Sequence, residues 1–231
     1  MVGFLPGEFS RVQGEGTVKT VFFCDSKLTP DPVPENTLFI CKEKALLHEF
    51  TQLVEFFDQS FHGENLNYVV FCLGSNDISH ADKKLVFSEK EQSIDFHVTK
   101  NGDLRYVSQC YNALLEAIVD LKNVNKLISF DAMARASSGF HNAGVEYLNR
   151  RVEKVHDGHA HFNTWKRFQH DNRKRKDKGV KNFPVWSERF DDVDDGKLKN
   201  DEKLKLAAAA VNALTNDGNL TVDDAVFLRK F

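Results

Sequence analysis

The residues of this chain best suited to chemistry follow a short apolar run. Thr-Val-Phe-Phe-Cys at 20–24 is followed directly by Asp25 and Ser26. A serine at the end of a strand can act as a nucleophile when a histidine base, an acid that orients the histidine and oxyanion donors surround it. The alternative is an Asx or Ser turn that caps the next segment. The rest of the chain must therefore be searched for those partners.

A second polar cluster follows another apolar run. Gly74, Ser75, Asn76 and Asp77 come directly after the strand-like segment 67–73. Glycine and asparagine at a strand end favour a tight turn with an amide aimed inward. The Asn76 side chain and the N–H of Ser26 are therefore the candidate oxyanion donors.

The elements that must position these residues alternate along the chain. Apolar runs predict buried strands, amphipathic spacing predicts helices, and the alternation indicates a parallel sheet covered on both faces. The carboxyl ends of such strands gather functional groups. Strands are predicted at 17–23, 37–41, 67–73, 126–134 and within 155–162, and helices at 46–57, 108–123, 142–155 and from Asn200, a candidate N-cap, onward.

One segment has a different pattern. Apolar residues alternate at Ile94, Phe96 and Val98 and again at Leu104 and Tyr106, around an Asn-Gly pair at 101–102. Asn-Gly tolerates the backbone of a type I′ turn, so the pattern predicts an inserted β-hairpin near 92–107.

One domain is predicted at 17–215, and the two ends of the chain lie outside it. Residues 1–16 are predicted to be an N-terminal arm, and 216–231 to hold a short helix at 222–230 that begins at a capping box.

The bulk composition is that of an ordinary globular protein, with 41% hydrophobic residues, 28% charged residues and a formal charge of −3. The four cysteines form no CxxC pair, which argues against a zinc site and favours reduced thiols. We expect no metal, no cofactor and no membrane partner. The lack of an 18-residue apolar run or signal peptide predicts a cytoplasmic location, with a nuclear one as the alternative.

The two strand-end blocks, "VFFCDSKLT" and "VVFCLGSNDI", together resemble the SGNH (GDSL) hydrolase family. The later stretch from Leu114 to Val152 is similar in order and spacing, with Ala134-Arg135 where the family has a Pro-Arg-type loop. The resemblance covers roughly 17–215 and implies an α/β fold: a flavodoxin-like three-layer α/β/α sandwich with a parallel sheet.

The family's motifs carry over only in part. Its Gly-Asp-Ser block reads Cys24-Asp25-Ser26, so the nucleophile is present and the glycine is not. Its second block supplies an oxyanion glycine, but the corresponding stretch, 39–50, has none, and Lys42 or Glu43 is expected to crowd the approach. Its third block, Gly-x-Asn-Asp, is intact as Gly74, Asn76 and Asp77.

The fifth block, Asp-x-x-His, has two candidates. The first is Asp157 with His159 or His161, whose spacings are two and four and which no apolar helix follows. The second begins at Asp195 and precedes an apolar helix, but Leu198 stands where the resemblance expects histidine. The helix favours the second candidate, so the base is predicted to be lost.

Loss of the base predicts loss of turnover, because general-base catalysis contributes roughly 10²–10⁴-fold and triad members act as a unit. The strand ends are then expected to hold a vestigial active site. Its residues are Cys24, Asp25, Ser26, Gly74, Asn76, Asp77, Asp195 and Leu198. The alternative is an active serine esterase that uses Ser26, Asn76, Asp157 and His161 or His159, as the resemblance implies for retrotransposon-type members. A domain that keeps the sheet but has lost the catalytic histidine is expected to bind RNA or a protein partner. The sequence does not indicate an oligomeric state.

A basic segment at 165–183 is the candidate RNA-binding surface. Basic residues contact phosphates and aromatic residues stack on bases, and Trp165, Phe168 and Phe183 are interleaved with the basic residues. The alternatives are a solvated loop or a nuclear-import tract. The basic residues are Lys166, Arg167, Arg173, Lys174, Arg175, Lys176, Lys178 and Lys181.

Overall fold

The computed structural model describes the sheet, its main helices and the loops between several of them. All structural statements below concern these residues. They are 9–24, 28–57, 64–71, 73–80, 85–88, 93–96, 104–130, 144–145, 147–152, 160–162 and 200–215.

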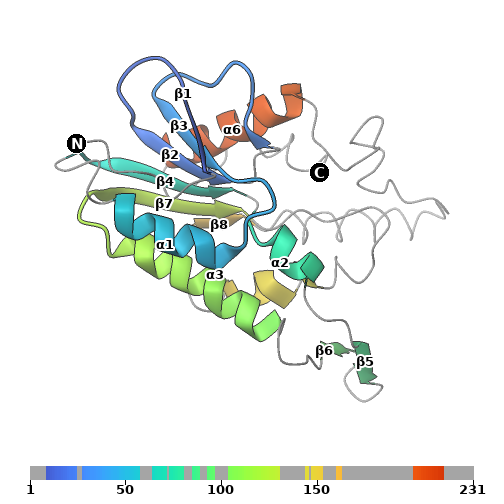
Figure 1. Cartoon of the computed structure of the whole chain (residues 1–231). Helices are drawn as coiled ribbons and strands as arrows, with labels where there is room; N and C mark the ends of the chain where they lie inside the picture. Colours follow the sequence, from blue (N-terminus) through green and yellow to red (C-terminus); the bar gives the residue numbers. More distant parts are fainter. Residues whose placement is uncertain are drawn as a thin grey trace.

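The centre of the molecule is a six-stranded sheet in the order β1-β3-β2-β4-β7-β8 (Figure 1). Only β1 is antiparallel to its neighbour; the pairs β3–β2, β2–β4, β4–β7 and β7–β8 are parallel. The chain thus has a mixed α/β fold with a mostly parallel sheet. The strands are β1 (Ser10–Gln13), β2 (Thr20–Cys24), β3 (Thr37–Cys41), β4 (Leu66–Phe71), β7 (Val124–Phe130) and β8 (Ala160–Phe162).

Among the five parallel strands, the strand order reverses direction once. From β2 the chain moves outward to β3, then returns to place β4 on the other side of β2 and continues to β7 and β8. In such sheets ligand sites form where the order reverses, outside the carboxyl ends of the strands. That point lies between β2 and β4, where Cys24 is in register with Phe71.

One face of the sheet is covered by α1 (Leu47–Phe57) and α3 (Leu104–Val119), as Figure 1 shows. Residues 144–145 and 147–152 are also helical. Val107, Tyr111, Leu114 and Ile118 recur at helical spacing in α3 and are buried in the core on this face. This burial confirms the predicted amphipathic helices.

The opposite face is covered by α6 (Asn200–Thr215) (Figure 1). The helix begins at Asn200, as predicted. Large rings project from the sheet on this face, and Phe22 stacks on Phe39 with centroids 4.4 Å apart. The helix meets these rings with small side chains, so large and small residues fill one layer together. Its buried residues in this core cluster are Leu206, Ala207, Ala210, Ala213 and Leu214.

The predicted hairpin at 92–107 is wrong in its pairing. Strand β6 (Ser93–Phe96) pairs with β5 (Leu85–Ser88), which precedes it. The predicted second strand is instead the first turn of α3, with Tyr106 57% exposed and Val107 buried. The strand prediction rested on only two alternating residues, Leu104 and Tyr106. The helical stripe from Val107 to Ile118 is buried in the core, and this burial favours a helix.

The chain ends differ less from expectation. Part of the predicted arm, Ser10–Gln13, joins the sheet edge as β1, and Ser10 Oγ donates to the Cys41 carbonyl at 3.0 Å. The helix predicted at 222–230 lies outside the described residues. Among the helices that are described, none is long and apolar enough to cross a membrane.

Candidate functional site

The candidate site is the edge of the sheet where β2, β3 and β4 end. Three of the predicted site residues, Gly74, Asn76 and Asp77, lie at this edge, on the turn after β4 and in the first turn of α2 (Ser75–His80). Cys24 ends β2 at the same edge. Asp25 and Ser26, which follow Cys24 in the chain, lie outside the described residues.

The backbone conformation at position 74 favours glycine. Its φ is +97°, a conformation that side chains with a Cβ rarely adopt. A Cβ at this position would also lie 3.1 Å from Leu148 Cδ2, which is tight. The Gly74 carbonyl accepts from the Ile78 N–H at 3.0 Å, so the residue ends β4 and starts α2 within one turn.

Asn76 holds two strand-end loops together. Its Nδ2 donates to the Ala45 carbonyl at 3.2 Å, which ties the turn after β4 to the loop between β3 and α1. An amide nitrogen has two hydrogens, so an oxyanion would have to use the second one. This bond gives Asn76 a structural role at the strand ends, whatever its second hydrogen contacts.

Asp77 caps helix α1. Both carboxylate oxygens lie 3.2 Å from the backbone nitrogen of Leu47, the first residue of α1. This N–H has no acceptor within its own helix, and a carboxylate is favourable at a helix N-terminus. Nothing in the sequence reasoning assigned this partner to Asp77, because the two residues are thirty positions apart.

Lys42 is one of the two residues, with Glu43, that were expected to crowd the oxyanion position in the stretch 39–50. Its Nζ lies 2.5 Å from Glu49 Oε1 and 5.5 Å from the centroid of the Phe9 ring. The other Glu49 oxygen accepts from the Leu46 N–H at 2.8 Å. The Lys42 side chain is therefore held against α1 and Phe9.

The ion pair changes the ionisation of Glu49. Burial alone would raise the pKa of Glu49, but the hydrogen bonds from Lys42 and Leu46 and the charge of Lys42 outweigh it and lower the pKa below its ordinary 4.5.

A contact that the sequence did not indicate fastens the start of α6 to the segment after β2. The Asp31 N–H donates to Asn200 Oδ1 at 2.7 Å, and Asn200 Nδ2 donates back to the Asp31 carbonyl. A side-chain amide can make this reciprocal pair with one backbone unit. Residues 169 positions apart are thereby joined.

His161 lies far along the sheet from β2. Its backbone is in β8, opposite Ser129 of β7, and Ser129 is opposite Val70, which is opposite Phe23. Three strand spacings of about 4.8 Å put roughly 14 Å between the α-carbons of His161 and Phe23. The remaining predicted site residues lie outside the described residues: Asp157, His159, Asp195, Leu198 and the eight basic residues between 166 and 181.

Cys110 and Tyr106 form a small polar group on α3. Burial raises the pKa of the half-buried Cys110 thiol, and the hydrogen bond with Cys110 raises the pKa of Tyr106. A raised pKa keeps more of the Cys110 thiol protonated, and the thiolate is the nucleophilic form of cysteine.

No group of three or more His, Cys, Asp or Glu side chains that could hold a metal occurs among the residues that the structure describes. A scan against models of known protein families finds no match to this chain, and a search of curated proteins finds no relative.

Proposed function

We propose that this chain is a catalytically degenerate SGNH hydrolase-like domain that binds RNA. The strand order supports the fold part of the proposal. Without the edge strand β1, the order β3-β2-β4-β7-β8 is the flavodoxin-like order of a three-layer α/β/α sandwich. The strand-end blocks that carry the resemblance flank the point where this order reverses.

The Asn200–Asp31 pair carries the argument for lost catalysis. It joins the start of α6 to a position five residues after Ser26. In the sequence, Leu198 stands two residues before Asn200, at the position where the resemblance expects histidine, and its side chain has no proton to exchange.

The other side chains at this edge serve the structure. Asn76 bonds to Ala45, and the Lys42 side chain bonds to Glu49 in the stretch that has no glycine. The backbone of His161, one of the two candidate bases of the esterase alternative with His159, is about 14 Å along the sheet from that of Phe23. This arrangement favours binding over ester hydrolysis.

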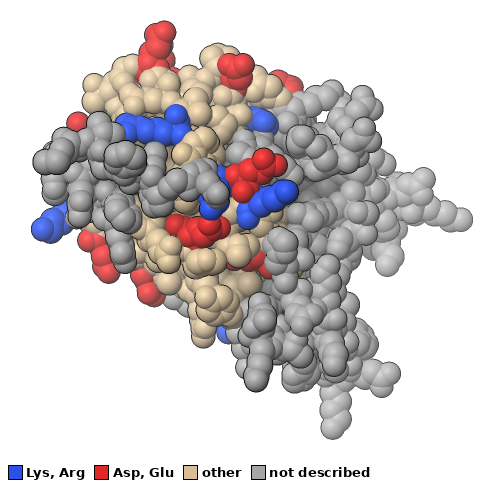
Figure 2. Space-filling view, in the orientation of Figure 1, with Lys and Arg blue, Asp and Glu red and all other residues tan. Residues whose placement is uncertain are grey.

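The charge distribution supports RNA as the ligand. The basic segment 165–183 holds eight Lys and Arg against Asp171 and Asp177, a net charge of +6, whereas the rest of the chain has a net charge of −9. Figure 2 shows Lys and Arg interspersed with Asp and Glu over the described residues of one face. A phosphate backbone would thus be attracted to the segment itself. A degenerate SGNH-like domain that binds RNA would resemble the C-terminal SGNH-like domain of the germ-plasm protein Oskar.

The RNA proposal is tested by fluorescence anisotropy with a labelled single-stranded RNA over a range of salt concentrations. The variant replaces residues 173–176, Arg-Lys-Arg-Lys, with alanine. The matched control removes the same charge from exposed positions elsewhere, Lys19, Lys122, Arg150 and Lys205. Loss of four phosphate contacts reduces the slope of log affinity against log salt by about 3 in the variant alone. Equal weakening in both would show that net charge, not the segment, binds RNA, and no binding by the wild type would leave a protein partner as the ligand.

The catalytic part is tested with p-nitrophenyl acetate. The wild type and Ser26→Ala are expected to show the same background rate. Saturating turnover that disappears in Ser26→Ala would overturn the proposal in favour of an esterase.

A further inference from the structure

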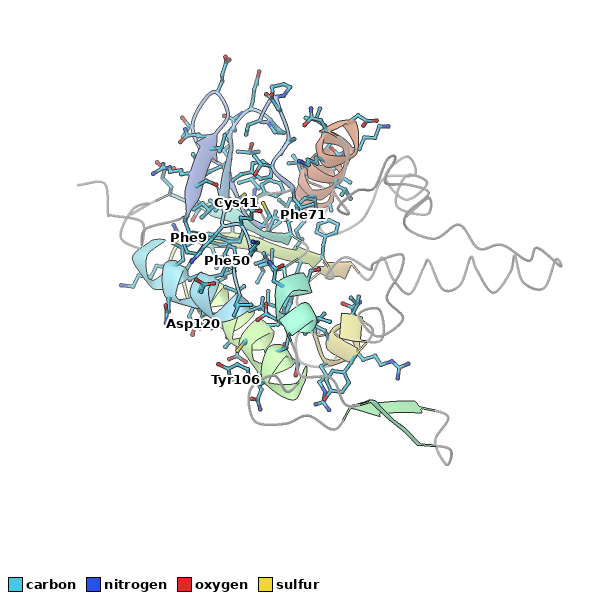
Figure 3. The ribbon with its side chains drawn as sticks, turned by 45° about the vertical axis from the view of Figure 1, so that its right-hand side comes forward. Phe9, Cys41, Phe50, Phe71, Tyr106 and Asp120 are labelled. Carbon is cyan, nitrogen blue, oxygen red and sulfur yellow. The ribbon has the colours of Figure 1, made fainter. Side chains whose placement is uncertain are left out.

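Two cysteines meet at the candidate edge of the sheet. Cys24 and Cys41 are the last residues of β2 and β3 and lie in register with each other. Their sulfur atoms are 3.0 Å apart, and both side chains are fully buried. Cys41 and Phe71, both labelled in Figure 3, belong to the core between the sheet and α6, as does Cys24.

The backbone around the pair suits a disulfide. In-register residues on neighbouring strands have α-carbons about 4.8 Å apart, within the 4.4–6.8 Å range of disulfides. Both side chains project from the same face of the sheet, because both belong to the same core cluster. The sulfur atoms need to approach by only about 1 Å to bond.

A third group holds the pair in place. Thr29 Oγ1 lies 2.9 Å from Cys41 Sγ, which fixes this sulfur beside that of Cys24. Cys110, the other cysteine whose side chain is described, lies on α3 and packs against the core on the opposite face of the sheet. The sheet therefore separates Cys110 from the pair.

We propose that Cys24 and Cys41 are a redox modification site, at which a peroxide converts the two thiols reversibly into a disulfide. One thiol gives up its proton, the resulting thiolate attacks hydrogen peroxide and becomes a sulfenic acid, and the released hydroxide takes up a proton and leaves as water. The neighbouring thiol then attacks that sulfur, the S–S bond forms, and a second water leaves. The sulfur pair loses two electrons, the peroxide is reduced to two waters, and a dithiol reductant reverses the reaction.

The site has a structural consequence for the candidate edge. Cys24 directly precedes Asp25 and Ser26, so the disulfide would fasten β2 to β3 immediately before the strand-end turn. Because both sulfurs are buried, only a small oxidant such as hydrogen peroxide is expected to reach them. The inference does not depend on RNA binding, and its test measures no RNA.

The test is a thiol count with a peptide map. The full chain is treated with a slight excess of hydrogen peroxide, denatured, and alkylated with N-ethylmaleimide. Intact mass is expected to fall from four labels, one for each of the four cysteines, to two, and to return to four after dithiothreitol. Trypsin cleaves after Lys19, Lys27 and Lys42, so peptides 20–27 and 28–42 are expected to be joined.

Two single variants complete the test. Cys110→Ala should lose two of its three labels on oxidation, whereas Cys41→Ala should retain all three. Four labels in the oxidised wild type, a link that involves Cys72 or Cys110, or only sulfinic acids at these positions would overturn the proposal. If Cys41→Ala does not fold, the wild-type peptide map still shows whether peptides 20–27 and 28–42 are joined.

Discussion

Removing the Asp77 carboxylate is expected to destabilise the fold through helix α1. Both oxygens of Asp77 lie 3.2 Å from the Leu47 nitrogen, at the first residue of the helix. Leu47 is only 1% exposed, so water is poorly placed to replace the lost acceptor. In Asp77→Ala this buried N–H would lose the carboxylate that accepts from it.

The magnitude follows from the geometry. A hydrogen bond to a charged group contributes about 1.5–3 kcal/mol, and a lost helix cap costs about 1 kcal/mol. The distance of 3.2 Å exceeds the common 2.9 Å, so the lower end applies. We expect Asp77→Ala to lose about 1.5 kcal/mol and Asp77→Asn about half of that, because the amide oxygen can accept but carries no charge.

The assay is urea unfolding followed by circular dichroism. The midpoint should fall with an unchanged slope, and the melting temperature should fall by about 3–6 °C for Asp77→Ala. Asp120→Asn is the matched control, because Asp120 is exposed and directly follows the last residue of α3. Loss of a negative charge there should change stability by only a few tenths of a kcal/mol, in the stabilising direction.

Two results would refute this reasoning. If Asp77→Ala loses less than about 0.5 kcal/mol, the cap contributes no more than an ordinary surface residue. If Asp77→Asn is as destabilised as Asp77→Ala, the hydrogen bond itself contributes nothing and only the charge matters.

Three further perturbations test other contacts at this edge. Gly74→Ala should lose at least about 1–2 kcal/mol in the same urea assay, because its φ is +97°; a neutral result would show that the turn can change conformation. Glu49 has a lowered pKa, so its ionised form stabilises the fold fully above pH 4.5 and less as the pH falls through the lowered value. The stability difference between the wild type and Glu49→Gln should therefore be constant above that pH and shrink on acidification; a difference that grows would contradict the Lys42 pairing. Asn200→Ala should speed hydrogen exchange at the Asp31 N–H, and an unchanged rate would mean that this bond does not protect the amide.

The buried strands and amphipathic helices were predictable because their signals are local. The strand at 37–41 was placed with its observed bounds, and α6 starts at Asn200 as predicted. The pairing of β5 with β6 was missed, because an Asn-Gly pair predicts a turn without showing which segment the chain pairs with. The helical stripe of α3 overrode that local signal through burial against the sheet.

The sequence by itself determined which segments are buried, the alternation of strands and helices, and the residue types at the strand ends. Only the tertiary structure decided what those residues contact: Asp77 with Leu47, Asn200 with Asp31, and Cys24 with Cys41. The physical reason is the range of the interaction. Apolar periodicity records the burial of each segment along the chain, whereas a contact between distant residues depends on strand order and register, which arise only when the whole sheet packs.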